Sequence, residues 1–216
     1  MSKQNNIIIL LDGEAAEEPW LTDLAKSAYV IAADGGIRHA ALLDVEPDLW
    51  IGDFDSSGAE FRNRYKNVPL KEYSSDKVKS DGELAIEEAL SLNPQKLILV
   101  GALGGKRTDH SFFNVLGALR FARKHTDTVF VLTGDGQIAM PLLPKQTLKL
   151  ARACGTTLSI IPFSDLKGLT IEGVQWPLEQ VDVELGSTHT LSNKLVSDAN
   201  VLLVEGHAIA IVQTKD

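Results

Sequence analysis

The sequence of 216 residues contains a single cysteine, Cys154. One cysteine excludes an intrachain disulfide and a cysteine cluster that could hold a metal ion. No apolar run approaches the roughly 20 residues that span a bilayer, so no membrane contact is expected. Residues 1–5 also lack the basic and then apolar order of a secretory signal. Together these absences favour a cytoplasmic protein.

Basic side chains are outnumbered by acidic ones, 21 against 29, which gives a net charge of −8. No run of basic residues interrupts this negative balance, so nucleic acid is not an expected partner. The composition, 44% hydrophobic and 23% charged, is that of a folded chain rather than a disordered one. The length predicts one or two domains.

The first part of the chain alternates short apolar runs with helical patterns. Runs without polar alternation are typical of strands covered on both faces, as in a parallel sheet. A capping box at residue 80 and apolar residues at helical spacing indicate helices. We therefore expect an α/β, Rossmann-like domain over residues 1–136. The expected strands are residues 7–11, 29–33, 49–51, 97–100 and 129–132, and the expected helices are residues 80–92 and 108–124.

From about residue 137 onward the helical patterns stop. Short β-type segments follow, separated by turns that contain glycine, which is typical of an antiparallel sandwich or barrel. Glycines and prolines cluster over residues 132–146 and mark a boundary, so we expect an all-β domain over residues 137–216. Its expected strands are residues 147–150, 156–162, 169–172, 181–185, 188–191, 201–204 and 208–212.

Aspartate and glycine follow four of the expected strands, at the positions where an open α/β sheet binds its ligands. For Asp12 and Asp135 the turn-forming habit of Asp-Gly is a sufficient explanation. The string Gly-Asp-Phe-Asp-Ser at residues 52–56 is different. In an extended segment Asp53 and Asp55 project to one side, and converging carboxylates repel unless a cation lies between them. Because Mg²⁺ is held by one or two carboxylates and substrate phosphates, this pair predicts a magnesium site.

A glycine-rich loop, residues 101–110, joins an expected strand to the longer expected helix. Glycines let a backbone approach an anion, and a helix N-terminus offers free N–H groups. Lys106 and Arg107 add positive charge suited to polyphosphate. The loop matches neither the P-loop nor the dinucleotide fingerprint. The alternative is a plain loop capped by Thr108, with Asp109 complementing the helix dipole.

Ser80 and Asp81 open the other expected helix. Capping explains Ser80, and the helix dipole explains an acidic residue in the first turn. Asp81 can also face the metal expected at Asp53 and Asp55. The residues alone leave both interpretations of Asp81 open.

In order and spacing, these motifs resemble the thiamine pyrophosphokinase family over nearly the whole chain. The more specific strings are Gly-Asp-Phe-Asp-Ser and Gly-Lys-Arg-x-Asp-His. The resemblance implies an α/β N-terminal domain, a C-terminal β-sandwich, and a homodimer with thiamine near its interface. It also implies ATP and thiamine as substrates, Mg²⁺ as cofactor, and AMP and thiamine diphosphate as products. The remaining motifs are Asp34-Gly35-Gly36, Lys77 with Ser80-Asp81, and Leu191-Ser192-Asn193.

The resemblance further implies roles for individual residues. Asp34 would lie near the reacting phosphates and thiamine, and Arg107 with Lys77 would clamp phosphate. The implied ligands of Mg²⁺ and ATP are the carboxylates of Asp53, Asp55 and Asp81. The implied nucleotide-binding loop comprises Gly104, Gly105, Lys106, Asp109 and His110, and the implied thiamine contacts are Thr190, Ser192, Asn193 and Trp176.

The chain departs from the family pattern at two places. Val78 stands where the first aspartate of Lys-Asp-x-[Thr/Ser]-Asp would be, and the glycine-rich loop is one residue longer before Lys106.

The implied reaction is transfer of the diphosphoryl group of ATP to the hydroxyl of thiamine. Two alternatives stay open. One is another Mg²⁺-dependent nucleotide diphosphotransferase or hydrolase, and the other is a thiamine-binding relative that has lost activity.

Overall fold

The computed structural model describes residues 3–54, 58–74, 76 and 78–214. Internal contacts divide the chain into two compact units. The first comprises the residues up to Gly117 with His125–Asp135, and the second comprises Ala118–Lys124 with the chain from Gly136 onward. In the described part of the chain no helix is long and apolar enough to cross a membrane.

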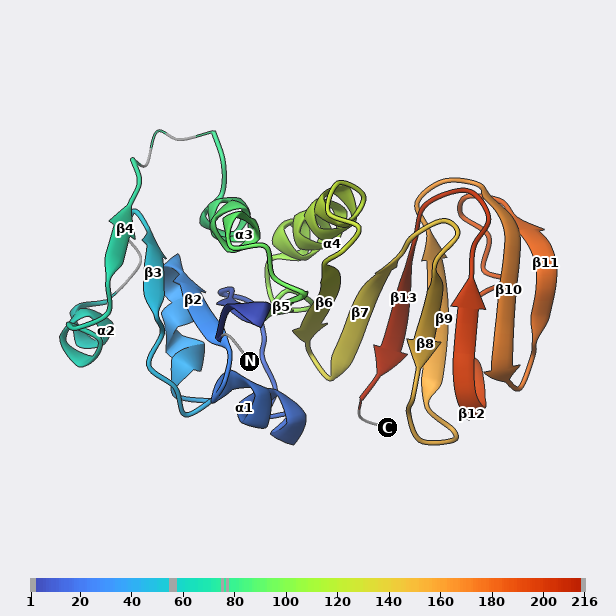
Figure 1. Cartoon of the computed structure of the whole chain (residues 1–216), viewed down its shortest axis with the longest axis horizontal. Coiled ribbons are helices and arrows are strands. Elements are labelled where there is room, and N and C mark those ends of the chain that lie inside the picture. The colour runs from blue at the N-terminus through green and yellow to red at the C-terminus, as the bar shows by residue number, and fades with distance from the viewer. Residues whose placement is uncertain (1–2, 55–57, 75, 77, 215–216) are drawn as a thin grey trace. The chain divides into compact units, whose positions relative to one another are not determined.

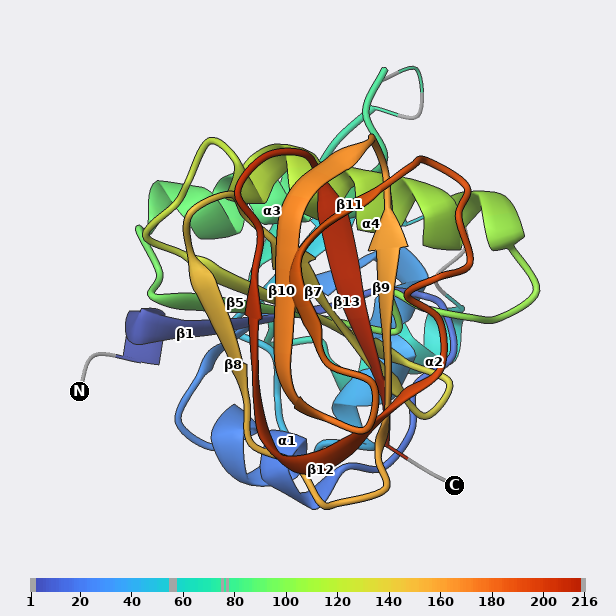
Figure 2. The same cartoon turned by 90° about the vertical axis from the view of Figure 1, so that its right-hand side faces the viewer.

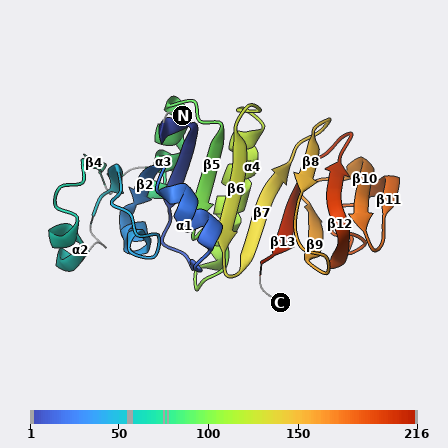
Figure 3. The same cartoon turned by 60° about the horizontal axis from the view of Figure 1, so that its bottom comes forward.

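The first unit is built on parallel strands in the order β6-β5-β1-β2-β3-β4. Figure 3 shows β6, β5 and β2 along the sheet, and β1 lies between β5 and β2. The expected parallel sheet is therefore confirmed, and the short β4 at its edge is an addition. The strands are β1 (Asn6–Leu10), β2 (Tyr29–Ala33), β3 (Leu49–Gly52), β4 (Leu70–Glu72), β5 (Lys96–Val100) and β6 (Val129–Gly134).

Helices cover both faces of this sheet, which explains why its strands are continuous apolar runs. The last four residues of β1, β2 and β5 are buried in each case. Helix α3 packs on β1, β2 and β3, and Figure 2 shows α1 on the opposite side from α3. The helices are η1 (Lys3–Asn5), α1 (Pro19–Ala25), η2 (Asp34–Ala40), α2 (Ala59–Arg64), α3 (Asp81–Ser91) and α4 (Thr108–Ala122).

The strand order places a switch point between β1 and β5. From β1 the chain proceeds through β2 and β3 toward one edge of the sheet, whereas β5 and β6 lie on the other side of β1. The connections that leave β1 and β5 therefore diverge, and open α/β sheets bind ligands in the crevice that results.

The second unit is antiparallel, with strands in the order β11-β10-β12-β9-β13-β7, and β8 also pairs with β12. The first residues of β12, Asn193 and Lys194, pair with β9, while its later residues pair with β8 and β10. This change of partner lets two sheets enclose one apolar core, as expected of a sandwich. The strands, labelled in Figure 1, are β7 (Gln137–Leu142), β8 (Thr147–Leu150), β9 (Thr157–Pro162), β10 (Leu166–Val174), β11 (Leu178–Val183), β12 (Asn193–Leu202) and β13 (Ala208–Gln213).

One expected strand of this unit was wrong, and one strand was missed. Residues 188–191 form turns rather than a strand, because the Thr190 hydroxyl bonds to the carbonyl of Ile160 and Ser192 has a φ of 59°. No strand was expected between the boundary and residue 147, yet Pro141 lies in β7 opposite Ile209. Proline is compatible with a strand where its missing N–H is not needed for a ladder bond.

Candidate active site

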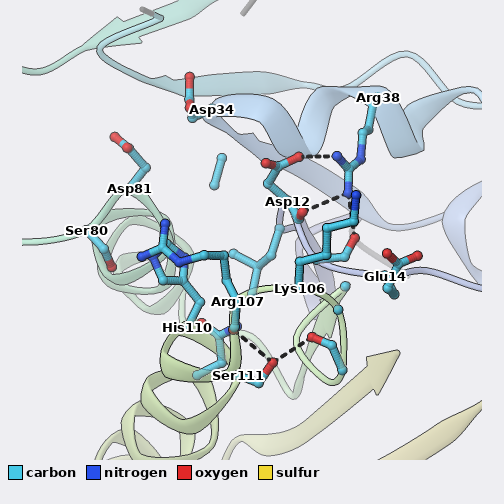
Figure 4. Close-up of a pocket in the computed structure, with 18 residues that line it drawn as sticks. Asp12, Glu14, Asp34, Arg38, Ser80, Asp81, Lys106, Arg107, His110 and Ser111 are labelled. Carbon is cyan, nitrogen blue, oxygen red and sulfur yellow. Dashed lines mark hydrogen bonds and ion pairs between the residues drawn. The ribbon is translucent and has the colours of Figure 1, made fainter. Parts of the chain in front are cut away.

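The candidate site lies at the carboxyl edge of the parallel sheet. A cavity of about 450 Å³ opens there, at the switch point between β1 and β5. Its walls are the turn after β1, the start of η2, the first turn of α3, the glycine-rich loop after β5 and the first turns of α4. Figure 4 shows Asp34 and Asp81 toward one end of this cavity and Arg38 and Lys106 toward the other. The first end is therefore acidic, whereas the other carries both signs of charge, because Asp12 and Glu14 lie there beside the two cations.

Three carboxylates come together at the acidic end. Asp34, Asp53 and Asp81 each offer one oxygen, and these oxygens lie within 4.8 Å of one another. They come from the start of η2, the residue after β3 and the first residue of α3. The family resemblance implied that Asp53 and Asp81 share a site, whereas it placed Asp34 beside the reacting groups rather than in the same cluster.

The backbone of Asp34 is held in an unusual conformation. Its φ is 41°, a region that residues other than glycine rarely adopt. The indole N–H of Trp50 donates to the Asp34 carbonyl at 2.9 Å. A Cβ at Gly52 would lie only 3.2 Å from both Cα and Cβ of Asp34, so glycine allows this approach. Strained backbone of this kind concentrates at functional sites, where the surrounding structure maintains it.

The geometric argument for Asp53 and Asp55 was wrong in one respect. Phe54, between them, has a φ of 60°, so the segment is not extended at its centre. The Phe54 ring is buried in edge contact with Trp50. Arg62 donates a hydrogen bond to the backbone carbonyl of Phe54 at 2.6 Å. These contacts fix the residue that follows Asp53. Asp55 lies outside the described residues, so its role as a metal ligand stays a prediction.

Asp81 is placed by the N-terminus of α3. The Ser80 hydroxyl accepts the N–H of Glu83 at 3.2 Å, which confirms the predicted cap. As the first helical residue, Asp81 has the position that favours an acidic side chain, and it also faces the carboxylate cluster. The helix-start position of Asp81 is therefore confirmed, and its role as a metal ligand stays a prediction. Lys77 lies outside the described residues, and Val78 is fully exposed.

The glycine-rich loop lines the cavity and brings Lys106 and Arg107 to it. Gly104 and Gly105 have φ values of 69° and 85°, which are open to glycine and strained for other residues. A Cβ at Gly104 would lie 2.6 Å from the Cβ of Asp135, so the end of β6 packs directly on the loop. Lys106 and His110 are exposed and line the cavity, and their binding of a nucleotide stays a prediction.

Arg107 and Asp109 form a two-point ion pair at the start of α4. Arg107 Nε donates to Asp109 Oδ1 at 3.0 Å, and Nη2 donates to Oδ2 at 2.7 Å. The guanidinium lowers the pKa of Asp109 to about 2, and the Asp109 carboxylate raises the pKa of Arg107. Asp109 therefore orients the Arg107 fork, a role that the sequence did not suggest.

We expect the Asp109 carboxyl to titrate at a pKa of about 2 in the ligand-free protein, and near 3.9 in Arg107→Gln. Because the folded pKa lies below that of the unfolded chain, the pair stabilises the fold above pH 3.9. This stabilisation is lost as the pH falls through 2, and it is small since both groups are exposed. Carboxyl NMR titration measures the shift, and an unshifted Asp109 in the parent protein would contradict the pairing.

The expected thiamine contacts gather at one corner of the second unit. The Trp176 side chain is 56% exposed, and Ser192 is also exposed. Asn193 is 8% exposed, and its side chain accepts the N–H of Trp176 at 3.1 Å and donates to the Trp176 carbonyl at 2.7 Å. Thr190 is buried and donates to Ile160. Trp176 and Ser192 are therefore presented outward, whereas Asn193 and Thr190 hold the backbone.

Sequence reasoning missed several residues that line the cavity. Asp12 was explained as a turn residue, and Glu14 and Arg38 were not singled out. Ser111 and Asn114 of α4 were also missed, although they donate to carbonyls of the glycine-rich loop, at Gly104 and Ala102. Their spacing of three residues beside a glycine-rich loop is the one signal that could have indicated them.

The fold and the site define a class. This is an α/β protein with a phosphate-type loop and a carboxylate cluster at its switch point, followed by an antiparallel β unit. Two family models match the chain. The model described as "Thiamin pyrophosphokinase, catalytic domain" matches residues 21–131, and the one described as "Thiamin pyrophosphokinase, vitamin B1 binding domain" matches residues 145–205. The chain belongs to the thiamine pyrophosphokinase family.

Individual relatives agree with this assignment. A thiamine pyrophosphokinase of Bacillus subtilis (strain 168) is 28% identical over 185 residues, which cover 83% of each chain. The crystal structure of a thiamine pyrophosphokinase from Bacillus subtilis superposes with a TM-score of 0.86 at 26% identity, covering 98% of this chain and all of the other. A thiamin pyrophosphokinase structure from Candida albicans, at 15% identity, shares the fold with a TM-score of 0.81, covering 98% of this chain and 89% of the other.

Proposed function

We propose that this kinase transfers the diphosphoryl group of ATP to the primary hydroxyl of thiamine, with AMP and thiamine diphosphate as products. The observation that carries the proposal is the cavity at the switch point, where a carboxylate cluster faces a basic glycine-rich loop. A polyphosphate chain with its metal needs both halves of such a site. The family to which the chain belongs makes thiamine the acceptor.

We propose Mg²⁺ as the cofactor, held by Asp34, Asp53 and Asp81. The donor set fits a hard cation, because three carboxylate oxygens from separate elements approach one another within 4.8 Å. Such a bound ion neutralises charge on the phosphates and orients them for in-line transfer. Asp55 is proposed as a further ligand, on the resemblance alone.

The protein's own groups would position the reactants and stabilise charge. The thiamine oxygen forms a bond to the β-phosphorus while the bond from that phosphorus to the bridging oxygen breaks, and AMP leaves with that oxygen. Asp34, held rigidly at the cavity, would accept a hydrogen bond from the thiamine hydroxyl, which orients its oxygen, and the Asp34 carboxylate would take up the proton as the new P–O bond forms. Arg107 and Lys77 offset the charge on the transferring group.

We propose that the corner around Trp176 binds thiamine. The match to the vitamin B1 binding domain spans this corner, and an exposed indole offers a flat face to an aromatic heterocycle. Ser192, exposed and next to Asn193 in the chain, offers a hydroxyl that can donate or accept a hydrogen bond. Asn193 contributes by fixing the backbone of Trp176.

We expect Asn193→Ala to raise the KM for thiamine well above its effect on the KM for ATP. The loss of a buried polar partner corresponds to about 1–3 kcal/mol, or roughly 5- to 150-fold. Steady-state kinetics with each substrate varied gives the two values. Asn200→Ala, further along β12, is the matched control and should change neither. Equal changes in both KM values, in a variant that stays folded, would mean that the corner does not recognise thiamine.

A homodimer is also proposed, as the resemblance implies. The apolar side chains of Phe112, Phe113 and Leu116 on α4 are exposed, and a subunit contact would remove them from water.

The proposed reaction predicts AMP release from ATP and Mg²⁺ only when thiamine is present. Release of ADP, or of AMP without thiamine, would favour a different nucleotide enzyme. Thiamine binding without ATP turnover would indicate a relative that has lost activity.

A further inference from the structure

Arg38 links the 3-10 helix η2 to the turn after β1, about 25 residues earlier in the sequence. Arg38, in η2, donates through Nη2 to the carbonyls of Asp12 and Gly13, at 2.7 and 2.8 Å. Its Nη1 pairs with the Asp12 carboxylate at 2.8 Å. The guanidinium therefore holds the turn after β1 at three points, and this turn forms one wall of the cavity.

His39 holds the same turn from the buried side. Its Nε2 lies 2.9 Å from the Gly13 carbonyl and 3.3 Å from Arg38 Nε. An imidazole nitrogen cannot donate and accept at once, and a carbonyl can only accept, so the shorter contact assigns the proton to Nε2. Burial lowers the pKa of His39, and the neighbouring guanidinium lowers it further. A neutral ring with its Nε2 proton on Gly13 fits both observations.

The turn after β1 contacts the glycine-rich loop without a side chain between them. A Cβ at Gly13 would lie 2.1 Å from the carbonyl oxygen of Gly101. A Cβ at Gly101 would lie 2.6 Å from the carbonyl oxygen of Leu11. A Cβ at Gly105 would lie 3.4 Å from Cγ of Glu14. Because packed interiors transmit displacement, a shift of this turn moves the loop with it.

The glycine-rich loop is held at other points by α4, through Ser111 and Asn114. In a trans peptide the C=O and the following N–H point in opposite directions, so a held carbonyl fixes an N–H as well. Arg38 and His39 fix the N–H groups of Gly13 and Glu14 in this way, while Ser111 fixes that of Gly105. Backbone N–H groups fixed in advance bind phosphate without the entropic cost of ordering them.

We propose that Arg38 and His39 are positioning residues, which set the turn after β1 and through it the glycine-rich loop for the phosphates of a nucleoside triphosphate. The proposal rests on the proposed function for the identity of the ligand. Arg38 differs from a phosphate-binding cation because three of its N–H groups already bond to the turn. Arg107 acts on the phosphates, and Arg38 acts on the loop that presents them.

The first test uses the ligand-free protein and needs no activity. Hydrogen exchange of the peptides covering residues 12–14 and 101–107 should be several-fold faster in Arg38→Gln than in the parent. Arg152→Gln, an exposed arginine of the second unit, is the control and should leave both peptides unchanged. Unchanged exchange in Arg38→Gln would overturn the proposal, whether or not the protein transfers diphosphate.

The second test measures nucleotide binding by calorimetry, without thiamine. The probe is α,β-methylene ATP with Mg²⁺, in which the bond that would break is blocked. Arg38→Gln should raise its dissociation constant by about 10-fold, within the ~100-fold that misplacement by about 1 Å can cost. His39→Ala should weaken binding similarly, and His39→Gln should restore it, because the glutamine amide can donate where Nε2 does. Parent-like binding in Arg38→Gln, or no rescue in a folded His39→Gln, would overturn the proposal.

Discussion

Replacing Asp53 by asparagine is expected to lower turnover by about 100-fold or more, with thiamine and ATP at saturation. The change preserves the shape of the side chain and removes one charge from the cluster with Asp34 and Asp81. Loss of one electrostatic contact to a transition state has effects of this size. Initial rates of AMP formation, measured over a range of Mg²⁺ concentrations, give the loss in turnover.

The stability of the same variant separates catalysis from folding. Without Mg²⁺ the melting temperature of Asp53→Asn should hold or rise, because repulsion among three carboxylates is relieved. Added Mg²⁺ should raise the melting temperature of the parent protein more than that of the variant. Asp127→Asn, an exposed aspartate outside the cluster, serves as control. Near-normal turnover in Asp53→Asn would mean that the cluster is not a catalytic metal site.

The second large effect is expected at Arg107. Arg107→Lys keeps the charge but loses the planar fork, and a lysine cannot reproduce the two-point pairing seen with Asp109. Turnover should fall clearly, by about 10-fold or more, as for the loss of a bond to a charged group. Both kcat and the KM for ATP should be measured, since a clamp on the transferring group acts mainly on kcat.

Arg64→Lys is the matched control, because Arg64 is an exposed arginine on α2 that lies over the ring of Tyr65. It should behave as the parent does. If Arg107→Lys also matches the parent, its guanidinium does not act on the phosphates as a fork. If Asp109→Asn keeps full activity while Arg107→Lys loses it, the arginine acts on phosphate without needing Asp109 to orient it.

The parallel sheet could be predicted because each of its longer strands has a recognisable pattern in neighbouring residues. Continuous apolar runs such as β1 and β5 need cover on both faces, and Asp-Gly turns follow at the carboxyl edge. The cap of α3 at Ser80 is equally local, since its hydrogen bond spans three residues. The same local signals placed Asp53 and the glycine-rich loop at one edge of the sheet, whereas the family resemblance brought Asp81 to them.

The remaining features depend on contacts between distant parts of the chain. The residues next to Phe54 in the sequence do not indicate its φ of 60°. Phe54 instead packs against Trp50 and accepts a hydrogen bond from Arg62. Arg38 holds carbonyls 25 and 26 residues earlier in the sequence. Asn193 likewise bonds to a backbone 17 residues away. A polar residue in such a role carries no local pattern. Asn193 was therefore interpreted as a ligand contact, and Arg38 was not singled out.

The fate of the β-phosphorus of ATP tests the central claim most directly. The protein is incubated with Mg²⁺, thiamine and ATP carrying ³²P at the β position, and the products are separated. Transfer of a diphosphoryl group predicts that all the label leaves the nucleotide and appears in thiamine diphosphate, in step with unlabelled AMP. Label that remains in ADP, or that appears in free pyrophosphate without thiamine diphosphate, would contradict the account.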